Sequence, residues 1–178
     1  MRKIIYYVAI SIDGFIEGKN GDISGFASSG KGVEKYLSDL QDFDTVIMGR
    51  KTYTFGYQFG LKAGQPAYPH MQHYIFSNTL SFENPHEKVQ VCKPYDTSLI
   101  EALKQEEGTD IYLCGGGRFA GWLLENELID VLKVKLNPLI LGEGTRLFGN
   151  STKQYQLKLV KGEGFESGLQ ILTYEVVY

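Results

Sequence analysis

The chain has 178 residues, of which 43% are hydrophobic and 22% charged, as in an ordinary globular protein with a sizeable core. Its formal net charge of −3 excludes a general attraction to nucleic acid or to acidic membranes, so an anionic ligand must be held by a local group of donors. The two cysteines lie far apart, and no apolar run has the length of a signal peptide or a membrane span. We therefore expect a reduced, cytoplasmic protein without nucleic-acid or membrane partners.

The first half of the sequence alternates between β-prone and helical segments. Residues 4–10 form a continuous apolar run, typical of a strand that is buried on both faces. Residues 11–30 are rich in Gly, Asp and Ser and predict a long irregular loop. The other elements expected here are a helix at 32–40, a strand at 44–48, a short helix from 49, a loop at 56–69 and strands at 73–76 and 88–91.

The second half begins with Ser98-Leu-Ile-Glu101, which matches a capping box and predicts a helix to about residue 107. A strand at 111–114, a helix at 118–126 and a strand at 131–136 are expected next. Residues 155–161 and 169–177 alternate around a Gly-rich turn and predict a C-terminal antiparallel pair. This order predicts a single α/β domain over residues 1–178, with three α/β/α layers and a mixed sheet.

Three consecutive glycines, Gly115, Gly116 and Gly117, follow the strand at 111–114 and precede Arg118 and Phe119. The run nominally fits the dinucleotide fingerprint G-x-G-x-x-G/A, in which bare backbone and a helix N-terminus face a phosphate. The full pattern fails, because the run lies late in the chain and no acidic residue ends the next strand. A tight strand-to-helix turn is the alternative explanation.

A second strand-to-helix junction, Gly49-Arg50-Lys51-Thr52, places two cations and a hydroxyl at a helix start. Cations there oppose the helix dipole, and a bound anion would remove that conflict. A third junction contains Ser77 and Asn78, which taken alone are common turn residues. Because parallel strands end at one edge of a sheet, we expect a ligand with two separated phosphate groups to bind there.

The motifs "AISIDGFI", "VIMGRKTY", "YIFSN", "YLCGGGRF" and "PLILGEGTRLF" together resemble the dihydrofolate-reductase-like superfamily. The resemblance is closest to the C-terminal reductase domain of the bacterial riboflavin biosynthesis protein RibD, and it runs from about residue 4 to residue 177. It implies a dihydrofolate-reductase-like mixed sheet and the use of NADPH. The zinc deaminase that often precedes this domain has an H-x-E and P-C-x-x-C pattern that is absent here, so a stand-alone reductase is expected.

The resemblance also implies roles for individual residues at three places along the chain. Arg50 matches the residue that holds the adenosine 2′-phosphate, within the helix start formed by Gly49, Arg50, Lys51 and Thr52. Thr52 matches a residue on a bridging phosphate, and Ser77 and Asn78 lie beside the 2′-phosphate. The remaining cofactor positions are the pyrophosphate loop Gly115, Gly116, Gly117 and Arg118 with the adjoining Phe119, and Ala9 and Ile16 at the nicotinamide.

In relatives, the first two glycines of the pyrophosphate loop are joined by a cis peptide bond, and the same is therefore expected between Gly115 and Gly116.

A proton donor near the substrate would help hydride transfer to a C=N bond, and two carboxylates are candidates for this catalytic role. Asp13 begins the loop beside the expected nicotinamide, although an Asp before a Gly is also a common turn former. Glu34 lies near the place of the acid in folate reductases, one residue short of the usual spacing. A solvated helix carboxylate is the alternative for Glu34.

The sequence departs from folate reductases at two points. Met71 stands where they carry an arginine that grips the glutamate tail, and Gly25-Phe26 stands where a tryptophan is usual. We therefore expect an NADPH-dependent reductase of a pyrimidine- or pteridine-like heterocycle, resembling 5-amino-6-(5-phosphoribosylamino)uracil reductase. Dihydrofolate reduction and a nucleotide-binding module without catalysis remain the alternatives. Arg146 is a candidate for a substrate phosphate, or else a surface loop residue.

Two further expectations concern metals and assembly. His70 and His73 have no cysteine or carboxylate at ligand spacing, so we expect no metal site. Members of the resembled family often pair through their C-terminal strands, and the alternating C-terminal segments therefore suggest a homodimer.

Overall fold

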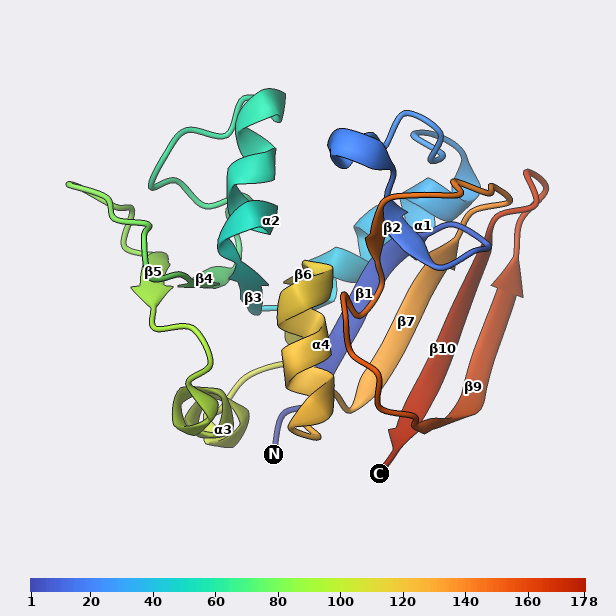
Figure 1. The fold of residues 1–178 in the computed structure, drawn as a ribbon. Coiled ribbons are helices and arrows are strands. Elements are labelled where there is room, and N and C mark those ends of the chain that lie inside the picture. The colour runs from blue at the N-terminus through green and yellow to red at the C-terminus, as the bar shows by residue number, and fades with distance from the viewer.

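An eight-stranded sheet forms the middle of the protein, which is described here for residues 1–178 as a computed structural model (Figure 1). The strand order is β5-β4-β3-β6-β1-β7-β10-β9. Strands β5, β4, β3, β6, β1 and β7 are parallel to one another, whereas β10 is antiparallel to both β7 and β9. The strands are β1 (Ile4–Ile10), β3 (Thr45–Gly49), β4 (Gln72–Phe76), β5 (Val89–Cys92), β6 (Ile111–Gly115), β7 (Val131–Leu136), β9 (Gln156–Gly164) and β10 (Gln170–Val177).

Helices cover both faces of this sheet, so the three-layer α/β/α architecture that the sequence predicts is confirmed. The helices are α1 (Lys31–Asp39), α2 (Arg50–Phe55), α3 (Thr97–Gln105) and α4 (Gly117–Glu125), with 3-10 turns η1 (Lys19–Gly21), η2 (Leu40–Asp42) and η3 (Gly56–Phe59). On one face α3 and α4 bury Ile100 and Leu123 in a cluster of 18 residues. On the other face Leu40 and Tyr53 belong to a cluster of 12 residues. None of the helices is both long enough and apolar enough to span a bilayer.

Strand β1 illustrates why the central strands are continuously apolar. Ile4 and Tyr6 point into the cluster beneath α4, while Tyr7 points into the cluster on the opposite face, and all three are fully buried. A parallel strand that is covered by helices on both faces has no position that faces solvent, so apolar residues are favoured at every position of the run.

The C-terminal strands pair as the sequence predicts, but they leave one edge of the sheet open. β9 pairs only with β10 and forms the edge, which Figure 1 shows without a covering helix. Leu157 and Leu159 are 44% and 57% exposed on this strand.

The capping box predicted at Ser98 is wrong. Helix α3 begins at Thr97, and its N-cap is Asp96, whose carboxylate accepts the Leu99 N–H at 3.0 Å. Ser98 lies inside the first turn and is exposed, so its hydroxyl is not at the position where it could cap the helix.

The segment at 11–30 contains more structure than the predicted irregular loop. Its residues Phe15–Glu17 form β2, which pairs antiparallel with β8 (Thr145–Arg146) in a small separate sheet. The hydroxyl of Thr145 donates to the Glu17 carboxylate across this pair. The partner strand lies more than a hundred residues away in sequence, so no local pattern around β2 could reveal the pairing.

Candidate functional site

The three predicted junctions, two from strand to helix and one from β4 into a turn, meet at one edge of the sheet, as parallel strands require. Gly49 at the end of β3 is in register with Phe76 of β4, and Met48 is in register with Gly115 of β6. Helix α2 therefore starts beside the start of α4 (Figure 1). A side-chain carbon placed on Gly49 would lie 3.9 Å from the Gly115 carbonyl oxygen. The two predicted phosphate-binding elements are thus in direct contact.

Each of the three glycines in the loop is required for a different reason. Gly115 has a φ of +127°, which residues with side chains rarely adopt, and its peptide bond to Gly116 is cis, as the resemblance implies. A side-chain carbon on Gly116 would lie 3.1 Å from the Thr52 hydroxyl oxygen. On Gly117 it would lie 2.2 Å from the Arg146 carbonyl oxygen. The lack of a side chain at Gly117 is therefore explained by the protein's own backbone and not by a ligand.

The start of α2 presents two free cations. Arg50 and Lys51 are exposed, neither forms an ion pair, and the first turn of the helix contains no acidic residue. No side chain caps this helix or α4. Both helix starts carry partial positive charge, so α2 and α4 offer neighbouring positions for anionic groups.

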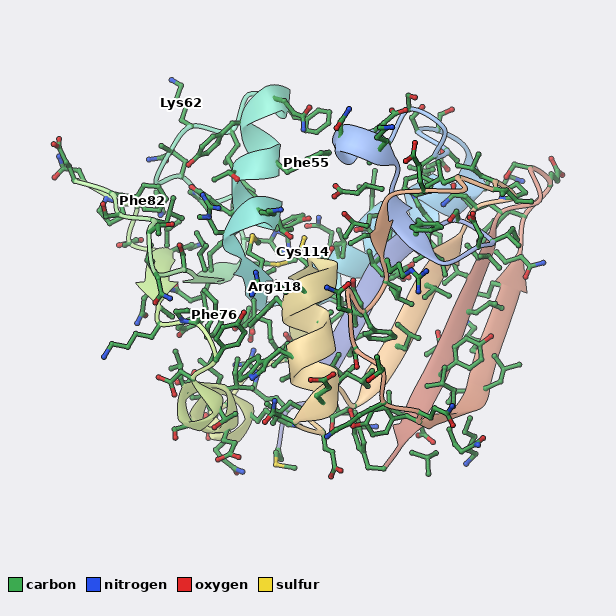
Figure 2. All side chains as sticks on the ribbon, viewed as in Figure 1. Phe55, Lys62, Phe76, Phe82, Cys114 and Arg118 are labelled. Carbon is green, nitrogen blue, oxygen red and sulfur yellow. The ribbon has the colours of Figure 1, made fainter.

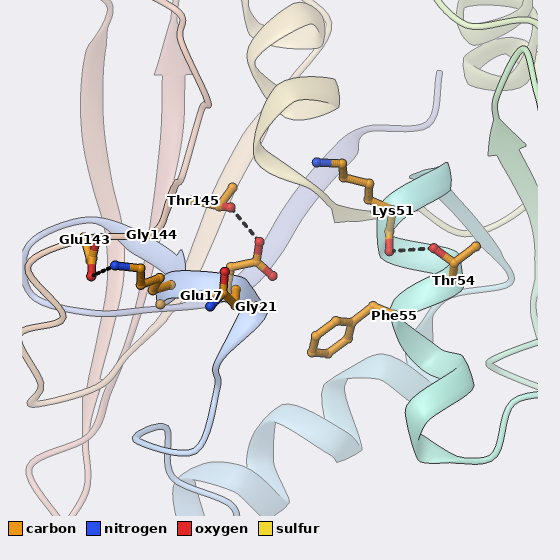
Figure 3. Close-up of a pocket in the computed structure, with 11 residues that line it drawn as sticks. Glu17, Gly21, Lys51, Thr54, Phe55, Glu143, Gly144 and Thr145 are labelled. Atoms are coloured by element: carbon orange, nitrogen blue, oxygen red, sulfur yellow. Dashed lines mark hydrogen bonds and ion pairs between the residues drawn. The ribbon is translucent and has the colours of Figure 1, made fainter.

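A polar pocket of about 620 Å³ opens between α2, residues 17–21 and residues 143–145 (Figure 3). Lys19 forms an ion pair of 3.3 Å with Glu143, and Glu17 accepts the Thr145 hydroxyl at 2.5 Å. Lys51 lines the pocket without a carboxylate partner, and Figure 3 shows Phe55 directed across the pocket toward Gly21. The acidic residues of the pocket are thus occupied, which leaves Lys51 as its free cation.

Two predicted nicotinamide-side residues also lie at this edge. Ile16 on β2 approaches the loop, since its Cδ1 atom would be 4.0 Å from a side-chain carbon on Gly116. Ala9 lies next to the last residue of β1 and is in register with Lys135 of β7. The structure therefore brings Ile16, Thr52 and Gly116 together.

Ser77 and Asn78 follow β4 at the same edge, but the Ser77 hydroxyl serves its own turn. Its oxygen accepts the N–H groups of Thr79 at 3.1 Å and of Leu80 at 2.9 Å. Asn78 is exposed, and its side chain makes no hydrogen bond within the chain, so its amide is free.

Arg118 and Phe119 direct their side chains away from the first pocket. The Phe119 ring is 7% exposed and stacks on Phe76 at 4.8 Å between centroids, so only its backbone can reach a ligand at the loop. The Arg118 side chain lines a second pocket of about 510 Å³, in front of α4. Figure 2 shows Arg118 at the start of α4.

The two carboxylates considered as proton donors lie outside the first pocket. The Asp13 carboxylate accepts the N–H groups of Leu141 at 3.1 Å and Gly142 at 2.7 Å. Hydrogen bonding from Ser11, followed by these N–H groups, lowers the pKa of Asp13 to about 2, so it carries no proton at neutral pH. Glu34 is exposed on α1 and forms neither a hydrogen bond nor an ion pair. This geometry favours the turn-forming and solvated alternatives.

A group of buried hydroxyls beneath the glycine loop has no counterpart in the sequence-based prediction. The Tyr36 and Tyr112 hydroxyl oxygens are 2.9 Å apart, and the Tyr68 hydroxyl lies 3.5 Å from the Cys114 sulfur. Burial raises the pKa of the Cys114 thiol and of these tyrosines, so all four groups are protonated at neutral pH. The hydrogen-bonded partners lie 76 (Tyr36 and Tyr112) and 46 (Tyr68 and Cys114) residues apart, so the sequence gave no signal of the group.

Other lining residues of the first pocket, such as Glu17, Glu143 and Thr145, were also not predicted. Residues 143–145 lie within "PLILGEGTRLF", so the motif marked the segment without assigning its side chains. No group of three or more His, Cys, Asp and Glu side chains is arranged to hold a metal ion.

Comparison with known proteins identifies the family. The model of the RibD C-terminal domain matches residues 2–171. The chain belongs to this family. It is a family of reductases of the riboflavin-biosynthesis type, and the dihydrofolate-reductase-like fold implied by the sequence is confirmed.

Several known proteins match this chain over nearly its whole length. The Bacillus subtilis proteins YwjB and YyaP are 29% and 30% identical to it, over 96% and 97% of this chain and 96% and 94% of their own. A Shewanella sp. PV-4 protein that bears a riboflavin-biosynthesis name has a TM-score of 0.81 at 25% identity, with both chains fully covered. The Thermotoga maritima deaminase/5-amino-6-(5-phosphoribosylamino)uracil reductase has a TM-score of 0.71 at 15% identity, over 99% of this chain and 57% of that one.

Proposed function

We propose that the protein is an NADPH-dependent reductase of a pyrimidine- or pteridine-like heterocycle. Its reaction resembles that of 5-amino-6-(5-phosphoribosylamino)uracil reductase. The observation that carries the proposal is the direct contact between the start of α2 and the glycine loop before α4. Two neighbouring positions for anionic groups, one with free cations and one with bare backbone, suit a dinucleotide that bears several phosphates.

The residues at this edge fit such a cofactor. Gly116 leaves its backbone open beside the Thr52 hydroxyl, and Arg50 supplies a planar cation that can fork onto a 2′-phosphate. When bound, NADPH supplies a hydride for the substrate carbon. Ala9 and Ile16 would contact the nicotinamide of the cofactor near the carboxyl end of β1. Lys51 would lie beside a negatively charged group of the ligand in the first pocket.

The structure offers no anchor for the glutamate tail of a folate at the position that folate reductases use. Met71 stands there and is fully buried in the core beneath α2. An arginine at this position would place a charge in an apolar cluster. The surroundings of Met71 therefore also differ from those of the arginine in folate reductases. This observation supports a substrate without that tail.

The cofactor proposal is tested by changing Arg50 to Ala. Loss of a charged hydrogen bond to a 2′-phosphate costs about 1.5–3 kcal/mol, so we expect NADPH affinity to fall roughly 10- to 100-fold while NADH affinity hardly changes. Isothermal titration with both cofactors measures this difference. The exposed Lys62→Ala variant is the control and should bind both as the wild type does. Equal weakening of NADPH and NADH by Arg50→Ala would remove the 2′-phosphate role.

Turnover separates a reductase from a binding module without catalysis. Pyrimidine and pteridine heterocycles, including 5-amino-6-(5-phosphoribosylamino)uracil and dihydrofolate, are screened for NADPH oxidation by absorbance. We expect steady consumption with a pyrimidine and none with dihydrofolate. Saturable NADPH binding without turnover on any of them would favour the module.

We further propose that residues 1–178 act as one domain in the cytoplasm and as a homodimer. Both cysteines are free, which suits a reducing compartment. The exposed apolar residues of β9 suit an interface between two copies of the chain.

A further inference from the structure

Lys135 is the only buried cation of the protein that has no carboxylate partner. The buried Lys and Arg side chains are those of Arg2, Lys104 and Lys135. Arg2 pairs with Asp44, and Lys104 pairs with Asp130 at 2.8 Å. Lys135 is 6% exposed and forms no ion pair. A buried charge without a partner destabilises the fold, so the presence of a lysine here requires a reason other than stability.

The protein uses little of the hydrogen-bonding capacity of this side chain. The Nζ atom donates to the Ala27 carbonyl over a long distance of 3.4 Å, and it lies 5.0 Å from the centroid of the Tyr36 ring. An ammonium group has three N–H donors, so two of them have no oxygen acceptor within the chain. Burial lowers the pKa of Lys135, and no neighbouring charge offsets this effect. An acceptor atom supplied by a ligand would stabilise the ammonium group.

Lys133, two residues earlier on the same face of β7, shows how the protein neutralises a lysine at this place. Its Nζ atom donates to the Asp39 carboxylate of α1 at 2.6 Å and lies 4.4 Å from the centroid of the Tyr7 ring. To Lys135, in contrast, α1 offers only the ring of Tyr36. The two lysines therefore differ in the carboxylate partner and not in the face of the sheet that they occupy.

Lys135 lies near the carboxyl edge of the sheet, beside the position proposed for the nicotinamide. It is in register with Ala9 of β1 on one side and with Ile171 of β10 on the other. Side chains alternate along a strand, so Ala9 lies on the same face as Tyr7, which contacts Tyr36 of α1. Ala9 and Tyr36 are both partly exposed, and the lysine stem is flexible. The ammonium group can therefore turn toward a ring that lies over Ala9.

The backbone on either side of the Lys135 ammonium is fixed by the buried side chain of Asn137. Its Oδ1 atom accepts the Ala27 N–H at 3.0 Å, and its Nδ2 atom donates to the Lys135 carbonyl at 3.0 Å. The same Nδ2 atom also donates to the Ile10 carbonyl at 3.3 Å. The Lys135 side chain thus starts from a rigid backbone, and only the stem beyond it needs to move when a ligand binds.

We propose that Lys135 determines the specificity of the proposed reductase by binding an electron-rich edge of the substrate ring, either a carbonyl oxygen or a deprotonated ring nitrogen. The inference rests on the proposed function, because that function places the ring over Ala9 beside the nicotinamide. A pyrimidine with oxo groups presents acceptors to the ammonium group, whereas the amidine edge of a diaminopyrimidine presents N–H donors that repel it. The class selected is therefore an oxo-substituted or anionic pyrimidine.

Binding of three small pyrimidines tests this selection without any turnover. The intact protein is titrated in a calorimeter with barbituric acid, which is an anion at neutral pH, with uracil and with 2,4-diaminopyrimidine. We expect barbituric acid to bind at least tenfold more tightly than 2,4-diaminopyrimidine, with uracil between them. Equal affinity for barbituric acid and 2,4-diaminopyrimidine, or no saturable binding of barbituric acid up to about 10 mM, would refute the proposal.

Substitution of Lys135 assigns the preference to its charge. Lys135→Met keeps an unbranched side chain without the ammonium group, and it should weaken barbituric acid at least tenfold without weakening 2,4-diaminopyrimidine. Lys135→Gln, which keeps a polar end without the charge, should give the same result. The exposed Lys62→Met is the control and should bind all three compounds as the wild type does. A preference for barbituric acid that persists in both Lys135 variants would overturn the role of this residue.

Stability provides a readout that a purely structural lysine would move in the opposite direction. Removal of the unpaired charge in Lys135→Met should raise the midpoint of thermal unfolding by about 2–4 °C. Lys104→Met is the matched control, because it leaves the Asp130 carboxylate without its lysine and should lower the midpoint. A lower midpoint in Lys135→Met would show that Lys135 serves the fold, which contradicts the proposal.

A final arm distinguishes failure of this inference from failure of the reductase proposal. The barbituric acid titration is run with and without NADP⁺ at a concentration that saturates the protein. If NADP⁺ binds and barbituric acid does not, the role of Lys135 is refuted and the reductase proposal stands. If NADP⁺ does not bind while barbituric acid binds through Lys135, the result counts against the reductase function and supports the ligand-binding role of Lys135.

Discussion

At the scale of single residues, the three adjacent glycines of the loop are required for different structural reasons. Gly115 adopts a positive φ angle. Gly116 allows the close approach of the Thr52 hydroxyl, and Gly117 allows the close approach of the Arg146 carbonyl. A ligand accounts for at most the first two. The third glycine packs the start of α4 against Arg146, the last residue of β8, next to Gly144 and Thr145, which line both pockets.

The contact at Gly117 predicts a large effect of a small substitution. In Gly117→Ala the added carbon would meet the Arg146 carbonyl oxygen at 2.2 Å, and both groups are backbone, so neither can move freely. We expect a loss of about 2 kcal/mol or more in the free energy of unfolding, measured with urea. Gly164→Ala is the matched control, because nothing lies within 4 Å of the added carbon there, and it should change stability by less than about 0.5 kcal/mol.

His73 predicts a dependence of stability on acid. It is fully buried; its Nε2 accepts the Tyr68 N–H at 3.2 Å, and its Nδ1–H donates to the Met71 carbonyl at 3.0 Å. Burial lowers the pKa of His73 from 6.5 to about 4. The unfolded chain therefore binds the proton more readily, and stability falls as the pH drops from about 6.5 to about 4, by about 3 kcal/mol.

The variant His73→Gln isolates this contribution, because a neutral amide cannot take up the proton. Urea unfolding of wild type and variant at several pH values between 4 and 7.5 measures it. The difference in unfolding free energy between wild type and variant should shrink as the pH falls. A difference that stays constant over this range would contradict the lowered pKa.

At the scale of elements, α3 shows how a cap shifts by two residues from its most obvious motif. Ser98 and Glu101 have the spacing of a capping box, but Asp96 holds the position that precedes the first turn. An aspartate is as good a cap as a serine, and it also places negative charge at the positive end of the helix. The sequence contained both candidates, and the packing of Ile100 and Leu103 against the sheet selects the register.

The cap assignment predicts different effects at two neighbouring residues. Asp96→Ala should lower the free energy of unfolding by about 1 kcal/mol, since the Leu99 N–H loses its acceptor. Ser98→Ala should leave it within about 0.5 kcal/mol of wild type. Thermal unfolding followed by circular dichroism compares the two. A larger loss in Ser98→Ala than in Asp96→Ala would restore the capping box.

At the scale of the whole molecule, the sheet is protected on both faces over most strands and open at β9. Every residue of β9 except Glu163 is exposed, and Leu157, Leu159 and Val160 are apolar. An open edge with apolar side chains favours association with other chains unless it is paired. The proposed homodimer would cover this strand.

The dimer is tested by placing a charge on the open strand. Leu159→Lys should shift the protein from dimer to monomer, because the interface would then bury one lysine charge from each copy of the chain. Sedimentation velocity measures the mass. Leu159 is more than half exposed, so the variant should fold normally. Lys161→Gln on the same strand is the control and should stay dimeric. A wild-type protein that sediments as a monomer at micromolar concentration would contradict the proposal.

The sequence by itself determined the layers, most strands and the edge at which the glycine-rich junctions meet, where we propose that a dinucleotide binds, because hydrophobic period and glycine-rich junctions are local signals. Strand β7 begins and ends where its alternating pattern predicts, at Val131 and Leu136. Only the tertiary structure decided what joins distant segments: the pairing of β2 with β8, the contact of Gly117 with Arg146, and the separation of Arg118 from Lys51 into different pockets. These features depend on residues that lie from about thirty to more than a hundred positions apart in the chain, and no local pattern encodes them.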